Sequence, residues 1–152
     1  MWCVRVQYSF TLAVPNSVWV VVGVIAAVLA IVLVLIVLPI IRFTITVDNN
    51  YIRAATPLMF RVTIKKEDVD HIAVVDLSQA PELRPTLRTF GIGLPGYKLG
   101  WFKLANGAKA FLAVTSSNKA VVIELKDGTY VIMTPKNLSG FLTVLKELGW
   151  LS

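Results

Sequence analysis

The chain has 152 residues, which is room for one domain of ordinary size beside a single membrane span. Its 15 basic and 9 acidic residues leave a net charge of +6, so attraction to anionic lipid or nucleic acid is allowed but not required. The single cysteine, Cys3, excludes an intrachain disulfide and a cysteine-based metal site.

Residues 1–14 alternate between apolar and polar side chains, which is typical of a half-buried strand. The apolar positions are Trp2, Val4, Val6, Tyr8, Phe10 and Leu12. An isolated strand is unstable, so this segment needs a partner or a membrane surface. Pro15 breaks the pattern, and we therefore predict a separate strand-like segment over residues 1–17.

Residues 18–41 form one apolar run without a charged side chain. A helix of that length is roughly 36 Å long, which is enough to cross a hydrocarbon core of about 30 Å with some tilt. The run is apolar on every side, and it is longer than the apolar region of a cleaved signal peptide. The sequence therefore predicts a transmembrane helix that stays in the lipid bilayer as an uncleaved anchor.

Two features indicate how this helix is oriented and what it contacts. Arg5 is the only basic residue before it, whereas Arg42, Arg53 and Arg61 follow it. The positive-inside rule then predicts a single-pass protein of the cell membrane with its C-terminal domain in the cytoplasm. A face of small residues is compatible with association into homo-oligomers and consists of Gly23, Ala26, Ala27 and Ala30.

Residues 42–152 are predicted to form one mainly β domain. Alternating patterns and turn residues predict strands at 43–47, 51–53, 60–64, 72–75, 101–104, 108–114, 120–125 and 129–133. Tight turns are expected at 48–50, 106–107 and 126–128. Residues 78–100 are rich in proline and glycine and are predicted to be a long irregular loop, and such loops are usually functional or mobile.

An amphipathic helix is predicted after the last strand, with Thr134 as its cap, Pro135 in its first turn and Gly149 as its stop. Its apolar stripe consists of Leu138, Phe141, Leu142, Leu145 and Leu148. The helix can plug the open end of a strongly bent antiparallel sheet of about seven strands. The predicted fold class is therefore mainly β (α+β), preceded by one transmembrane helix.

The stretch from Gly91 to Gly96 matches the letters of the G-x-G-x-x-G nucleotide motif, but its context argues against a nucleotide site. A dinucleotide fingerprint needs a strand before it and a helix after it. Pro95 and Gly100 oppose a helix, and Trp101 begins a predicted strand. We predict a glycine-rich turn between strands.

The sequence offers no set of residues for catalysis or metal binding. His71 is the single histidine, and no metal-ligand spacing of histidine, cysteine or carboxylate accompanies it. The nearby Asp68, Asp70 and Asp76 fit the solvated face of a strand and its connection. We therefore expect no catalytic residue, no metal, no cofactor and no enzymatic activity.

The charges are polarised along the chain. No acidic residue lies between Glu82 and Glu124, whereas this span holds Arg84, Arg88, Lys98, Lys103, Lys109 and Lys119. Each cation near an anionic membrane surface contributes roughly 1 kcal/mol, and the candidates for headgroup binding are Arg84, Lys98, Lys103 and Lys109. A solubilising surface explains the same charges, and both alternatives stay open. Aromatic residues among the cations also fit core and interface roles, which argues against nucleic acid.

The stretch from Arg88 to Phe102 resembles the R-x-x-G-x-G-x-P-G-x-x-x-G-x-F signature of prokaryotic (bacterial and archaeal) pleckstrin-homology-like domains. Later segments are also similar to that family, namely Val121-Val122-Ile123, Asp127-Gly128, Tyr130-Val131-Ile132 and Thr134-Pro135. The resemblance covers roughly residues 42–148. It implies a curved seven-stranded sheet capped by a C-terminal helix, frequent association with membrane spans, and no catalytic residues.

Eukaryotic pleckstrin-homology domains often bind phosphoinositides through basic residues of the first strand loop. The first turn here, Asp48-Asn49-Asn50, holds no lysine or arginine, which argues against inositol phosphate binding. We expect a membrane-anchored, non-enzymatic module that binds a protein partner through the long loop, with anionic-lipid binding as the alternative. The candidate binding residues of the loop are Arg88, Gly91, Gly93, Pro95, Gly96, Tyr97 and Trp101.

Overall fold

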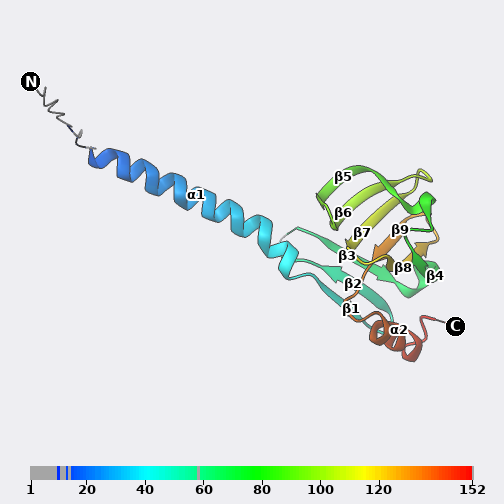
Figure 1. Cartoon of the computed structure of the whole chain (residues 1–152). Coiled ribbons are helices and arrows are strands. Elements are labelled where there is room, and N and C mark those ends of the chain that lie inside the picture. The colour runs from blue at the N-terminus through cyan, green and yellow to red at the C-terminus, as the bar shows by residue number, and fades with distance from the viewer. Residues whose placement is uncertain (1–9, 11–12, 14, 58, 152) are drawn as a thin grey trace, which may run out of the picture. The chain divides into compact units, whose positions relative to one another are not determined.

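Figure 1 shows the computed structural model of the chain, which describes residues 10, 13, 15–57 and 59–151. The chain divides into two compact units, Met1–Val37 and Leu38–Ser152, which are treated separately below. The strand expected over residues 1–14 lies outside the described residues apart from Phe10 and Ala13, which belong to no strand.

Helix α1 (Asn16–Ile41) has 26 residues, and its side chains are exposed from Asn16 to Ile36. Because it has no polar face, it differs from the surface helix of a soluble domain. Among the described residues it is the one helix long and apolar enough to cross a membrane, over Asn16–Leu38. The Arg42 N–H donates to the Leu38 carbonyl at 3.1 Å, which closes its last turn.

Sheet A is antiparallel and has the strand order β1-β2-β3. Its strands are β1 (Thr44–Val47), β2 (Tyr51–Ala55) and β3 (Arg61–Lys65). The predicted turn over residues 48–50 is confirmed, with the Asp48 N–H donating to the Tyr51 carbonyl at 2.9 Å. Alternate residues of β2 and β3 are buried, as the period-2 pattern predicted.

Sheet B has six strands in the order β4-β8-β9-β7-β6-β5. They are β4 (Val69–Asp76), β5 (Pro85–Leu94), β6 (Tyr97–Leu104), β7 (Lys109–Thr115), β8 (Lys119–Leu125) and β9 (Tyr130–Met133). Strand β9 lies between β7 and β8, antiparallel to β8 and parallel to β7. The described part of the domain therefore has nine strands in two sheets, with one parallel pair, where about seven antiparallel strands were expected.

The prediction of a long irregular loop over residues 78–100 is wrong, because most of these residues lie in β5 and β6. Only the segment before β5 is a connection, and it contains the 3₁₀ turn η2 (Pro81–Leu83). Strands β5 and β6 form a hairpin whose turn is Pro95–Gly96, with Leu94 paired to Tyr97. Glycine and proline disfavour strands in isolation, but pairing with β6 overrides that local preference.

Helix α2 (Leu138–Glu147) begins three residues later than a Thr134 cap predicted. Asn137 is the cap, and its side-chain oxygen accepts from the Gly140 N–H at 3.0 Å. The predicted stop is confirmed, because Gly149 has a φ of +69° and the Trp150 N–H donates to the Leu145 carbonyl at 2.8 Å. These contacts satisfy the carbonyls that the end of a helix leaves free.

The apolar side chains form two clusters. The main core receives residues from both sheets and from α2, and all five residues of the predicted helix stripe pack in it. An outer cluster lies on the other face of sheet B and includes Ala80, Leu83, Phe102, Leu104, Leu112, Val122 and Ile132. Sheet B therefore buries apolar side chains on both faces, and the connection before β5 covers the outer one.

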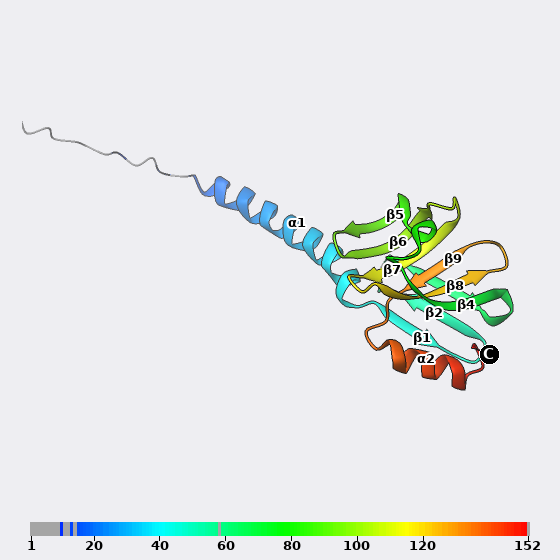
Figure 2. The ribbon, with the colours of Figure 1, turned by 45° about the vertical axis from the view of Figure 1, so that its right-hand side comes forward.

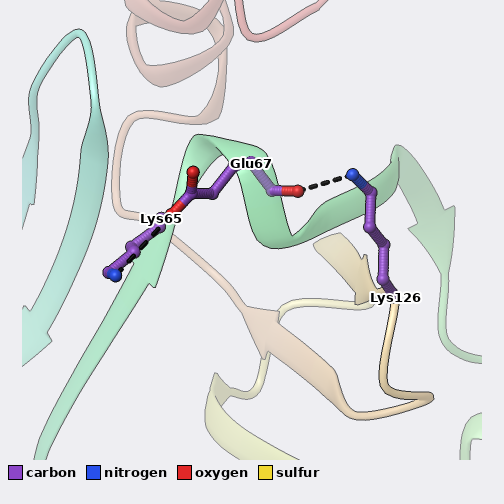
Figure 3. A network of polar contacts seen from close by, with 3 residues as sticks. All are labelled: Lys65, Glu67 and Lys126. Carbon is purple, nitrogen blue, oxygen red and sulfur yellow. Dashed lines mark hydrogen bonds and ion pairs between the residues drawn. The ribbon is translucent and has the colours of Figure 1, made fainter.

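A polar network ties the turn between β8 and β9 to η1 (Lys66–Asp68), as Figure 3 shows. The Lys126 ammonium donates to the Glu67 carbonyl at 2.6 Å, and the Lys126 N–H donates to the Asp68 carbonyl at 2.9 Å. The Glu67 carboxylate pairs with Lys65 at 3.6 Å. The two hydrogen bonds to backbone carbonyls hold the two turns together. The ion pair is exposed and adds little to the stability of the fold.

Candidate functional site

The hairpin β5–β6 carries all seven residues predicted for protein binding. Arg88, Gly91 and Gly93 lie in β5, Pro95 and Gly96 form the turn, and Tyr97 and Trp101 lie in β6. The seven residues are therefore arranged by strand pairing and by the alternation of strand faces, and not by a mobile loop.

Alternation sends Tyr97 and Trp101 to the main core. Both are partly buried there, and the Trp101 ring meets Phe111 edge-on at 5.4 Å between ring centres. Burial raises the pKa of the Tyr97 phenol. Their position makes these two aromatic residues supports of the hairpin more than parts of its free surface.

Strand β5 exposes three large apolar side chains that the sequence analysis did not single out. Leu87, Phe90 and Leu94 are 60%, 56% and 49% exposed, and we call them the β5 stripe. Strand β5 is an edge strand of sheet B, and it lies at the end of the domain away from α2 (Figures 1 and 2). The stripe was missed because the segment was predicted to be a loop.

The basic residues of β5, β6 and β7 are divided between the two faces of sheet B. Arg88 pairs with Phe102 of the outer cluster, and Lys98 lies on that same face of β6. Lys103 lies on the opposite face, where it pairs with Lys109, and the Lys109 ammonium sits 4.5 Å from the centre of the Trp101 ring. Within the described residues, none of these cations lies within 4.0 Å of a carboxylate.

Two adjoining hollows open on the outer face near the hairpin. The first, which we call the outer hollow, has a volume of about 170 Å³ and is lined by Leu77, Leu83, Arg84, Pro85, Lys98, Leu112, Val114 and Ile132. The second has a volume of about 530 Å³ and runs along β5, where Arg88 lies beside Gly93. Pro85 and Lys98 line both hollows, Arg84 lines the first, and Arg88 lines the second.

Residues after α2 make hydrogen bonds at and beside the first turn of the domain, residues 48–50. The Trp150 indole donates to the Asp48 carbonyl at 2.8 Å, and the Lys66 ammonium donates to the Leu148 carbonyl at 2.9 Å. Lys65 pairs with Glu67, so the two lysines nearest this turn already have partners.

No group of histidine, cysteine and carboxylate residues suited to a metal ion occurs in the described part of the chain. His71 is exposed in β4 and pairs with Glu124 of β8. The pKa of Asp76 is lowered, chiefly because its carboxylate accepts hydrogen bonds from the side chain and backbone of Ser78. Through these two bonds the carboxylate holds the turn that follows β4.

The comparisons with known proteins agree with this architecture. A protein family described as "Bacterial PH domain" matches residues 42–148, which include both sheets and α2. No curated protein and no solved structure matches the chain. The family match covers more than half of the chain, and it confirms the resemblance and the fold class expected from the sequence. The chain is therefore a member of the bacterial PH domain family.

Proposed function

We propose that this protein is a membrane-anchored, non-enzymatic module that binds a protein partner through the β5 stripe. PH domains are generally non-catalytic binding modules, and membership of the family supports this class of function. Helix α1 supports the anchor, because its length and composition suit a membrane span. The basic residues Arg42, Arg53 and Arg61 that follow α1 favour a cytoplasmic domain.

The observation that carries the proposal is the exposed apolar edge of sheet B. An edge strand presents unpaired backbone groups, and natural proteins usually protect it with charge, bulges or a covering element. Two register shifts, between Pro85 and Leu87 and between Arg88 and Phe90, protect the first half of β5. The three side chains of the stripe are nevertheless about half exposed or more. An apolar surface of this kind is typically covered by a partner.

Photo-crosslinking of the full-length protein in its native membrane tests this proposal. Benzoylphenylalanine replaces Leu87, which avoids disturbing the contact between Phe90 and Phe60 at 5.4 Å. We expect one discrete protein adduct, lost when Leu94→Gln is added to the same chain. The matched control places the crosslinker at Val74, which is 44% exposed on the other edge strand, β4. Equal adducts from positions 87 and 74, or none from 87, would contradict the proposal.

Anionic lipid is a second candidate partner, favoured by the pair Lys103 and Lys109. These like charges are directly opposite in the register of β6 and β7, an arrangement that costs stability unless an anion neutralises it. The full-length protein in nanodiscs should then show contact between the Trp101 region and anionic headgroups that falls steeply with salt. The variant Lys103→Gln should weaken that contact, and equal behaviour in neutral nanodiscs would exclude lipid as the partner.

A further inference from the structure

Sheet B is apolar on its outer face as well as on the face toward the main core. Ala110–Ala113 of β7 and Ala120–Ile123 of β8 are each buried without a break. A strand with one solvated face would alternate instead, so this sequence encodes two faces that both need cover. The outer cover is a chain segment without a long helix or strand, in which Ala80 and Leu83 are the buried residues.

This cover leaves a hollow over part of the face beneath it. The segment lies over the outer cluster, but beyond Leu83 the apolar side chains of Leu112, Val114 and Ile132 line the outer hollow. Its volume of about 170 Å³ is comparable with a dry apolar cavity of about 150 Å³ in another protein that holds benzene. The hollow therefore has room for an apolar body of about six carbons.

Two cations define the polar part of the outer hollow. Arg84 and Lys98 line it, and in the described residues neither has a carboxylate within 4.0 Å, including Glu82 two residues before Arg84. Arg88 lines the adjoining hollow along β5. An apolar wall beside convergent polar groups is the usual composition of a small-molecule site, and here those groups are positively charged.

We propose that the outer hollow binds an anion that carries a short aliphatic chain, such as a medium-chain carboxylate or the first part of an anionic lipid. The anionic group lies between Arg84 and Lys98, and the chain packs on Leu112, Val114 and Ile132. This site is on the face of sheet B opposite Lys103 and Lys109. It rests on the hollow and its cations and does not depend on a partner at the β5 stripe.

The test uses the full-length protein in phosphatidylcholine nanodiscs, with isoleucine methyl groups labelled for NMR and hexanoate as the probe. Ile132 lines the hollow, and Ile64 of the main core is the internal reference. We expect a saturable shift of the Ile132 methyl signal while Ile64 stays unchanged. Acetate, which has the charge alone, and hexanol, which has the chain alone, should each bind at least about tenfold more weakly, because each lacks one part of the recognition.

Two substitutions, each with a matched control, assign the binding to the hollow. Val114→Phe fills the apolar part and should abolish the hexanoate shift, whereas Val74→Phe on β4 should leave it intact. Lys98→Gln removes a cation and should weaken binding about tenfold, whereas Lys136→Gln, at an exposed lysine outside the hollow, should not. No saturable shift at Ile132, equal binding of hexanol, or unchanged binding in Val114→Phe would each overturn the proposal.

Nanodiscs of phosphatidylglycerol distinguish the two sources of the anion. A shifted Ile132 signal without hexanoate, which Val114→Phe reverses, would support the site and identify an anionic lipid as its occupant. Hexanoate that binds equally in both lipids would support the site and identify a free carboxylate.

Discussion

Gly91 and Gly100 face each other across β5 and β6 so closely that neither position has room for a Cβ atom. A Cβ on Gly91 would lie 2.3 Å from the Leu99 carbonyl oxygen, and one on Gly100 would lie 2.3 Å from the Phe90 carbonyl oxygen. Both obstacles are backbone atoms, which cannot swing away as a side chain can. Gly91 and Gly100 therefore allow the two strands to approach closely.

The first prediction concerns this close approach. Gly91→Ala or Gly100→Ala should lower the free energy of unfolding by about 2–4 kcal/mol, because each adds a backbone clash at a positive φ. Gly93→Ala is the control, since its Cβ would meet only the Arg88 side chain and Phe102 at 3.6 Å or more, and it should change stability by less than about 1 kcal/mol. Denaturant unfolding of the full-length protein in detergent, followed by tryptophan fluorescence, measures the difference. Equal effects at positions 91 and 93 would contradict the steric explanation.

Local chemistry explains which elements were predictable from the sequence. Gly107 and Gly128 have φ values of +86° and +81° in the two predicted hairpin turns, and turn residues of this kind act within a few positions of the chain. The stripe of α2 was predictable for the same reason, because helix periodicity is a local property. Strand β5 was not, because its stability comes from pairing with β6 and not from its own residues.

The candidate site was only partly predictable. Its seven residues do belong to one hairpin, but the burial of Tyr97 depends on β6 beginning at that residue, whereas a strand was predicted only from Trp101 onward. The face on which Arg88 lies also depends on the register shifts in β5, which no local pattern reveals. The local pattern predicts Thr134 as a helix cap, because its competing contact, with the Thr115 N–H at 2.8 Å, is 19 residues away.

The second prediction separates these two roles at the start of α2. Asn137→Ala should lower the free energy of unfolding by about 1 kcal/mol, because it removes the cap on the Gly140 N–H. Thr134→Val should also lower it, by about 1–3 kcal/mol, because the Thr115 N–H then lacks its partner in a partly buried position. Far-UV circular dichroism should show fraying of the helix only for Asn137→Ala. Fraying in Thr134→Val instead would restore Thr134 as the cap.

A third prediction concerns Trp150, which lies beyond the family match and closes the first turn from 102 residues away. Trp150→Phe keeps an aromatic ring but loses the hydrogen bond to the Asp48 carbonyl, so we expect a loss of about 1 kcal/mol. Trp150→Ala also empties a buried position and should cost about 3–5 kcal/mol. Hydrogen exchange should quicken at the Asp48 N–H in both variants. Unchanged exchange there would show that the turn is closed by other contacts.

The fourth prediction is an alkaline loss of stability that involves Tyr130. Its phenol donates to the Glu124 carboxylate at 2.8 Å, and that hydrogen bond, with burial and the nearby negative charge, raises its pKa. The folded state therefore holds this proton more tightly than the unfolded state. The contribution to stability is complete below a pH of about 10 and is lost as the pH rises through the raised pKa.

Tyr130→Phe isolates this effect, because Tyr97, whose pKa is also raised, stays in both proteins. At neutral pH the variant should be less stable than the wild type, since it lacks the hydrogen bond to Glu124. The gap between their unfolding midpoints should narrow above a pH of about 10. A gap that stays constant up to a pH of about 11 would exclude coupling between this proton and folding.

The last prediction separates stability from function at the pair Lys103 and Lys109. Removing one of two like charges that face each other across strands should stabilise the domain, so Lys103→Gln should raise the free energy of unfolding by a few tenths of a kcal/mol, up to about 1 kcal/mol, at low salt. It leaves the contact between Lys109 and Trp101 in place. Lys136→Gln, another exposed lysine, is the control and should have a smaller effect. A gain in stability that disappears with added salt, together with weaker contact with anionic nanodiscs, would show that the repulsion is kept for binding. A loss of stability in Lys103→Gln would show that the lysine supports the fold, and the argument for an anionic partner at this pair would fail.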